Sequence, residues 1–135
     1  MSWKIKAFNE LTAEELYSIY YLRTKIFVVG QKRIYQEVDE VDPKAVHVFY
    51  DKNDKITAYA RVYLIDGGKK VSFGRFVTVP EERGKGLGAD LLEHVRAMIQ
   101  DRFPGKPIEI KAQQQVAGFY AKYGFKQQGD PFIFE

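Results

Sequence analysis

The segment 71–92 constrains the fold of this chain most strongly, because it joins a strand to a helix through a glycine-rich turn. A run of β-branched and aromatic residues ends at Pro80, and glycine then recurs at positions 84, 86 and 88. Backbone amides in such a turn are left uncovered by side chains, and they lie at the positive end of the helix dipole. Arg83 and Lys85 add positive charge beside them. The segment therefore predicts an anion site, and a diphosphate is the ligand that suits it best.

The size and composition of the chain indicate one globular domain. Of its 135 residues, 45% are hydrophobic and 15% are aromatic, so a core can form without disulfides. The absence of cysteine excludes thiolate zinc sites, and the two histidines have no ligand partners at a useful spacing, so we expect no metal. Without a signal sequence or a membrane-length apolar run, we expect a cytoplasmic protein that does not bind membranes. A net charge of +3 from interspersed charges predicts no nucleic-acid partner.

Hydrophobic periodicity predicts strands and helices along the whole chain. The predicted strands are 3–8, 46–50, 56–65, 71–79 and 108–112, with turns at 51–54 and 66–69. The predicted helices are 12–30, 87–103 and 116–123, the last ended by Gly124, and a terminal hairpin turns around 129–131. Thr12 and Glu15 have the spacing of a capping box, and residues 31–43 form an acidic irregular segment. Hairpins followed by one βαβ crossover predict a mixed α/β or α+β domain.

Three phosphate-binding patterns can be compared with the glycine-rich turn. A Walker A loop requires G-x-x-x-x-G-K-[ST], which the chain does not contain. The dinucleotide fingerprint G-x-G-x-x-[GA] does match Gly84-Lys-Gly-Leu-Gly-Ala89, and Glu109 follows roughly 20 residues later. Its context differs, because residues 80–83 separate Gly84 from the strand and only one βαβ unit follows the hairpins. The third pattern is a loop that binds acyl-CoA.

This third pattern resembles the signature of the GCN5-related N-acetyltransferases, the GNAT family. Arg83, Gly86 and Gly88 match its [QR]-x-x-G-x-[GA] element, and Phe119-Tyr-Ala-Lys-Tyr-Gly-Phe125 is similar to its second element, [LF]-Y-x-x-x-G-F. The two elements occur in the order and at the spacing typical of the family.

A narrower resemblance to the ElaA-like subgroup covers residues 27–39 and the short segments Tyr59-Ala-Arg61 and Gly74-Arg75. The chain departs from that subgroup at Gly30, where glutamate is usual, and at Arg33, where cysteine is frequent. The subgroup commonly continues beyond the last strand with an acidic, histidine-containing tail.

The resemblance implies a single GNAT domain over residues 1–135, with a mixed central sheet of six to seven strands flanked by about four helices. It implies acetyl-CoA as cosubstrate and a primary amine of a small molecule or peptide as acceptor, and it allows a homodimer. The residues it assigns to cofactor binding are Phe76, Val77, Thr78, Arg83, Gly84, Lys85, Gly86, Leu87, Gly88 and Gln113.

Direct acetyl transfer needs a proton donor for the leaving thiolate and an unprotonated amine. Tyr120 aligns with the tyrosine that the family often uses as general acid, although packing beside Phe119 would also explain it. An amine like that of lysine is almost fully protonated at pH 7, and Glu37 and Asp39 are the candidate bases. A solvated acidic loop would equally explain these two carboxylates.

The two histidines and the rival functions complete the expectations from sequence. His47 lies in an apolar strand and is expected to be packed, whereas His94 is expected at the surface. A non-catalytic acyl-CoA-binding module would keep the turn 83–88 without needing Tyr120. Association with RNA would require a clustered basic face, which the sequence does not show.

Overall fold

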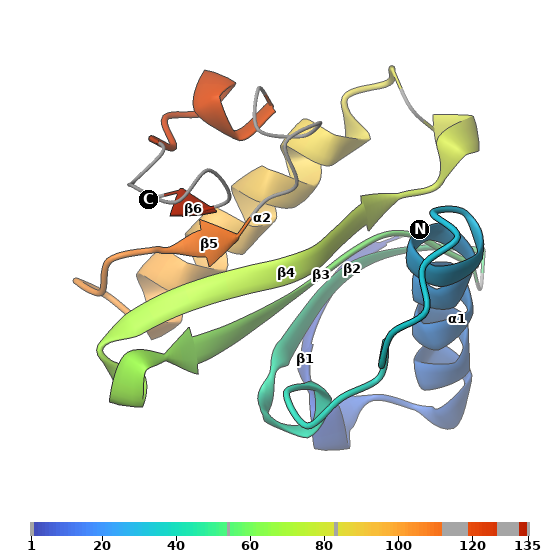
Figure 1. Ribbon diagram of the computed structural model, residues 1–135, viewed down its shortest axis with the longest axis horizontal. Coiled ribbons are helices and arrows are strands. Elements are labelled where there is room, and N and C mark those ends of the chain that lie inside the picture. Colours follow the sequence, from blue (N-terminus) through green and yellow to red (C-terminus); the bar gives the residue numbers. More distant parts are fainter. Residues whose placement is uncertain (1, 54, 83, 112–118, 127–132, 135) are drawn as a thin grey trace.

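The computed structural model describes residues 2–53, 55–82, 84–111, 119–126 and 133–134 (Figure 1). Its main sheet is antiparallel and has the order β1 (Ser2–Ala7), β2 (Val46–Lys52), β3 (Lys55–Ile65) and β4 (Lys70–Thr78). A second antiparallel pair joins β5 (Ile110–Lys111) to β6 (Ile133–Phe134). The longer helices are α1 (Ala13–Arg23) and α2 (Leu87–Arg102), and residues 119–122 are also helical. Shorter helical turns are η1 (Phe8–Glu10), η2 (Thr24–Val29), η3 (Asp42–Lys44), η4 (Asp66–Gly68) and η5 (Pro80–Glu82). The predicted α+β class is confirmed.

The sheet separates two hydrophobic clusters, because successive residues of a strand point to opposite faces. Val48 belongs to the cluster beneath α2, whereas the next residue, Phe49, belongs to the cluster beneath α1. In the same way Ala58 and Ala60 face α2, while Tyr59 between them faces α1. The two helices therefore cover opposite faces of the sheet, as Figure 1 shows.

Helix α1 begins at the predicted capping box. The Glu15 amide donates to Thr12 Oγ1 at 3.0 Å, and the Thr12 amide donates to Glu15 Oε1 at 2.9 Å. The predicted single helix over 12–30 is wrong in its second half, because α1 ends at Arg23 and continues as the π-helix η2. The Gly30 amide bonds to the Lys25 carbonyl at 2.8 Å, five residues back. Hydrophobic spacing cannot separate these two helix types, since their periods differ by less than one residue per turn.

Strand β4 contains a bulge that the alternating pattern of its residues did not indicate. Tyr59 pairs with Val77 and Arg61 pairs with Gly74, so two residues, Arg75 and Phe76, stand opposite Ala60 alone. Arg75 also adopts a left-handed backbone conformation, with φ of +51°. Such a bulge interrupts the ladder and increases the local twist of the strand.

β4 and β5 diverge, and this divergence corrects the predicted single sheet. The only parallel bridge described beside β4 joins Val71 to Ile108, two residues before β5, after which β5 pairs with β6 instead. Figure 1 shows the two strands separating from this point. The described part of the chain thus holds a sheet of four strands and a sheet of two, rather than six to seven strands in one sheet. Within the strand predicted at 108–112, β5 covers residues 110 and 111, and residue 112 and the hairpin predicted around 129–131 lie outside the described residues.

Candidate functional site

The turn between β4 and α2 has the backbone conformation that an anion site requires. Gly84 and Gly86 have φ of +84° and +80°, in the left-handed region that favours glycine. Gly86 is the N-cap of α2 and supplies no side-chain acceptor, and the first helical hydrogen bond runs from Asp90 N to Gly86 O at 3.0 Å. The amides of the helix's first three residues therefore lack acceptors within the helix. Together with the helix dipole they can bind a phosphate group.

Lys85 adds positive charge to this turn, and Gly88 leaves space beside its backbone. Lys85 has a side chain that is 65% exposed, and its Nζ lies 3.5 Å from Glu82 Oε2. Among the described residues, a Cβ added to Gly88 would meet the Phe119 ring alone, at 3.7 Å, which is an ordinary contact. The described part of the fold therefore leaves room above Gly88. Arg83 and Gln113 lie outside the described residues.

The end of β4 borders an aromatic cluster. Beyond Val71, no described residue pairs with the outer edge of β4, so that edge of Phe76 to Thr78 has no strand partner there. Val77 is buried against the α1 side, whereas the Phe76 ring packs on the other side with Phe119, at 5.7 Å between centroids. The predicted strand residues thus line the place where β4 and β5 separate.

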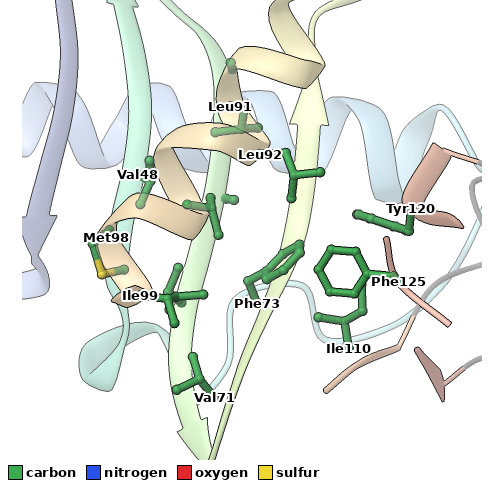
Figure 2. Packing of buried hydrophobic residues seen from close by; sticks show 14 residues of the cluster. Val48, Val71, Phe73, Leu91, Leu92, Met98, Ile99, Ile110, Tyr120 and Phe125 are labelled. Atoms are coloured by element: carbon green, nitrogen blue, oxygen red, sulfur yellow. The ribbon is translucent and has the colours of Figure 1, made fainter. Parts of the chain in front are cut away.

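Tyr120 lies in this aromatic cluster and is 6% exposed. Its ring centroid is 5.8 Å from that of Phe76, 6.0 Å from that of Phe73 and 5.8 Å from that of Phe125. Figure 2 shows Phe73 and Phe125 with Tyr120 beside β4. Burial raises the pKa of the Tyr120 phenol well above its usual value. A tyrosine hydroxyl is already protonated at neutral pH, and the raised pKa makes it a weaker acid while leaving it able to donate a hydrogen bond.

The structure places Glu37 in a buried ion cluster. Its Oε2 accepts from Arg23 Nε at 2.7 Å and from Arg75 Nε at 2.9 Å, and its Oε1 accepts from the Tyr35 hydroxyl. Burial and the Glu37 carboxylate together raise the pKa of Tyr35 to about 12. Glu37 itself is 6% exposed.

Asp39 is also held by a guanidinium group. Its carboxylate oxygens lie 2.6 and 3.1 Å from Arg61 Nη1 and Nη2. The hydrogen bond from Arg61 holds the pKa of Asp39 below its usual value. The two candidate bases are therefore close together in the fold but engaged by arginines.

Arg23, Asp42 and His47 extend this cluster, and the first two were missed by sequence reasoning. Arg23 is fully buried on the last turn of α1, and its Nη1 donates to Asp42 Oδ1 at 2.6 Å. The His47 Nε2 donates to the Asp42 carbonyl at 3.0 Å, so its Nδ1 accepts from the Tyr59 hydroxyl at 2.6 Å. Burial lowers the pKa of His47, which keeps the ring neutral. His47 is thus a packed histidine, as predicted, whereas His94 is half-buried and stacks on Trp3.

A groove of about 1160 Å³ lies elsewhere, between α1 and the β2–β3 hairpin. Its walls include Tyr17, Tyr21 and the η5 turn, but none of the described residues of the bulge or of the turn 84–88. It therefore adjoins the anion site without containing it. Within the described ranges no group of three metal-ligating side chains occurs, and no helix has the length and apolarity needed to cross a membrane.

Comparison with known proteins places this geometry in a family. A family model described as "Acetyltransferase (GNAT) domain" matches residues 10–135. A UPF0039 protein of Schizosaccharomyces pombe is 38% identical over 95% of this chain and 86% of its own length. Protein ElaA of Escherichia coli is 31% identical over 93% of this chain and 84% of its own length.

Solved structures agree with the sequence comparison. The crystal structure of Escherichia coli ElaA has a TM-score of 0.89, covering 98% of this chain and 95% of that chain at 29% identity. A crystal structure described as an acyl-CoA N-acyltransferase from Pseudomonas aeruginosa has a TM-score of 0.90, covering 98% of this chain and 96% of that chain at 32% identity. The chain that carries the glycine-rich turn, the bulged strand and the buried tyrosine therefore belongs to the GNAT acetyltransferase family and, within it, to the ElaA-like group.

Proposed function

We propose that this protein transfers the acetyl group of acetyl-CoA to a primary amine, by direct attack of the amine on the thioester. The observation that carries the proposal is the order of three features along β4. The strand has a bulge at Arg75. The ring of the next residue, Phe76, packs on the buried Tyr120, and a turn rich in exposed amides follows the end of the strand. An extended thioester with a diphosphate at its far end suits this order. The resemblance to an acyl-CoA N-acyltransferase supports the same ligand class.

The binding part of the proposal uses backbone groups. The amides at the start of α2, with Gly84 and Gly86 shaping the turn, would hold the diphosphate, and Lys85 would add charge beside it. The edge of β4 from Phe76 to Thr78, which no described strand pairs with, would bind the amides of the pantetheine arm. Arg83 and Gln113 remain predicted contacts.

The chemical part of the proposal needs stabilisation at both ends of the breaking bond. The amine nitrogen bonds to the carbonyl carbon, and a backbone amide at the bulge polarises the carbonyl oxygen. The C–S bond then breaks, and the sulfur takes the proton of the Tyr120 hydroxyl. The proton that the amine nitrogen loses on becoming an amide passes to water, and the Tyr120 phenolate regains a proton from water, so the proton count closes. The packing of the Tyr120 ring on Phe76 would hold this hydroxyl beside the strand that binds the thioester.

We do not assign Glu37 or Asp39 as the general base. Each carboxylate is bound by at least one guanidinium group, and the Arg61 hydrogen bond lowers the proton affinity of Asp39. An aspartate so stabilised in its ionised form is a weak acceptor of the amine proton. Both oxygens of the Glu37 carboxylate already accept hydrogen bonds, from two guanidinium groups and from the Tyr35 hydroxyl. Both residues instead hold and charge the loop 31–41, which joins η2 to η3 beside β4.

Replacing Tyr120 with phenylalanine tests the catalytic claim and separates it from the binding-module alternative. We expect calorimetry to show acetyl-CoA affinity within about threefold of wild type, because the turn is untouched. Release of free CoA thiol during a screen of amine acceptors should fall roughly 100-fold in kcat, the usual contribution of a positioned acid. Unchanged kcat in Tyr120→Phe would leave the hydroxyl without a catalytic role. Binding of acetyl-CoA with no turnover of any amine would favour the non-catalytic module.

A further inference from the structure

We propose that the ion pair between Arg75 and Glu37 is a positioning device, which holds the β4 bulge in its working shape and ties it to the loop 31–41. Arg75 is the bulged residue of β4, and Glu37 lies in the middle of that loop. The inference rests on the proposed function, because it concerns the strand that would bind the thioester. It assigns neither residue a contact with substrate.

The backbone of Arg75 is in a conformation that needs support from its surroundings. Its φ of +51° lies in the left-handed region, which is energetically unfavourable for a non-glycine residue. In a bulge the residue also lacks the ladder partner that would otherwise fix it. Contacts of the Arg75 side chain can therefore help to hold this position.

That side chain is held at several atoms by the loop. Arg75 Nε donates to Glu37 Oε2 at 2.9 Å, and Nη2 donates to the Glu37 carbonyl at 3.3 Å. Nη2 also lies 3.5 Å from Asp39 Oδ2, and the guanidinium carbon is 5.5 Å from the centre of the Tyr35 ring. One residue of β4 is thus fixed by both the side chain and the backbone of Glu37.

Glu37 is in turn anchored from the core, so it can serve as a fixed point. Arg23, fully buried at the end of α1, donates Nε to the same Oε2 and Nη2 to the Glu37 carbonyl, both at 2.7 Å. The Tyr35 hydroxyl occupies Oε1. The guanidinium groups of Arg23 and Arg75 therefore both bind the Glu37 carboxylate. Through Glu37, the bulge of β4 is connected to the end of α1.

Phe76 connects the Arg75–Glu37 ion pair to the reacting groups. This residue follows Arg75 directly, and its ring packs on Tyr120. When the ion pair is lost, the bulge can relax toward regular strand geometry, and the amide and ring of Phe76 move with it. The turn 84–88 lies beyond the end of β4 and keeps its diphosphate contacts. We therefore expect loss of kcat with little loss of acetyl-CoA affinity.

The variants Glu37→Gln and Arg75→Lys test this, with Glu15→Gln as the matched control. Glu15 is likewise a buried carboxylate with two cationic partners, Lys4 and Lys6, but it joins α1 to β1. We expect both test variants to lower kcat at least tenfold while the Kd for acetyl-CoA changes less than threefold. Glu15→Gln should lower thermal stability and keep kcat. Wild-type kcat in Arg75→Lys and Glu37→Gln, measured well below their unfolding temperatures, would overturn the inference.

Two further measurements keep the test decisive. Arg75→Lys keeps the charge at a side chain that is 22% exposed, so it should fold even where Glu37→Gln does not. If wild-type protein acetylates no amine, the proposed function fails, and amide hydrogen exchange then judges the positioning claim separately. Faster exchange in both 31–41 and 74–78 for Arg75→Lys, but not for Glu15→Gln, supports the device. Unchanged exchange in these segments overturns it.

Discussion

At the scale of single residues, two glycines of the turn have different reasons to be glycine. Gly86 has a positive φ and nothing within 4 Å of an added Cβ, so its backbone conformation alone favours glycine. Gly88 is the second residue of α2, its φ is not positive, and an added Cβ would make only an ordinary contact with Phe119. No described neighbour requires glycine at position 88, and under the proposed function the diphosphate would approach the backbone there.

The substitution Gly88→Ala should therefore separate stability from binding. Alanine in a helix restricts the unfolded chain and should raise the free energy of unfolding by roughly 0.5–1 kcal/mol. Its methyl group should obstruct the diphosphate and weaken acetyl-CoA binding at least tenfold. Urea unfolding and calorimetry measure the two effects. Gly86→Ala is the control for the stability measurement. Its positive φ strains an alanine, so this substitution should lower the free energy of unfolding by about 1 kcal/mol. Undiminished affinity in Gly88→Ala would remove the turn from the binding site.

Residue-level prediction from the sequence succeeds where the partners are close along the chain. The capping box of Thr12 and Glu15 is a three-residue pattern, and the structure contains both of its hydrogen bonds. The burial of Arg23 has no such local sign, because a single arginine on a helix usually lies at the surface. Its partners Glu37 and Asp42 are 14 and 19 residues away, and only the fold brings them together.

At the scale of elements, α1 is attached to β1 through Glu15. Lys6 Nζ lies 2.9 Å and Lys4 Nζ lies 3.2 Å from its carboxylate oxygens. Burial acts to raise the pKa of Glu15, but the hydrogen bonds from the Thr12 amide and the two lysines outweigh it and lower the pKa to about 2. An ionised Glu15 thus stabilises the packing of the first strand against the first helix.

This attachment predicts how stability depends on pH. A carboxyl whose pKa is lowered on folding stabilises the protein above its unfolded pKa of about 4.3, and that stability is lost as pH falls toward 2. The contribution is about 2–3 kcal/mol after allowance for partly exposed lysines. Glu15→Gln should cost this amount at pH 7 and less at pH 3, as measured by urea unfolding. The exposed neighbour Glu14→Gln should cost less than about 0.5 kcal/mol. An equal loss at both pH values would contradict the attachment.

Element boundaries were predicted well for β1 to β4, because alternating apolar residues mark strands that pack on both faces. The bulge at Arg75 escaped prediction, since one inserted residue leaves the strand's composition unchanged. The change from α1 to η2 escaped it for a similar reason, because Ile26 and Phe27 face the core in either kind of helix. Both irregularities lie next to the candidate site, where the backbone departs from regular geometry.

At the scale of the whole molecule, the separation of β4 from β5 creates the candidate site. Two hydrophobic clusters hold α1 and α2 on opposite faces of the sheet, and the aromatic cluster around Tyr120 lies where the strands part. The sequence order of elements predicted the α+β class and the crossover through α2. It did not predict that β4 and β5 separate in the described part of the chain, because the single bridge described at Val71 has no sign in the composition of either strand.

The measurement that tests the central claim most directly is thermal unfolding with and without saturating acetyl-CoA, with NAD and ATP as controls. A ligand at 100 times its Kd adds about 2.7 kcal/mol to the stability of the folded protein, which raises the Tm of a domain of this size by several degrees. The account predicts that rise with acetyl-CoA and not with NAD. No rise with acetyl-CoA, or a rise with NAD alone, would contradict the assignment of the glycine-rich turn and of the strand that leads to it.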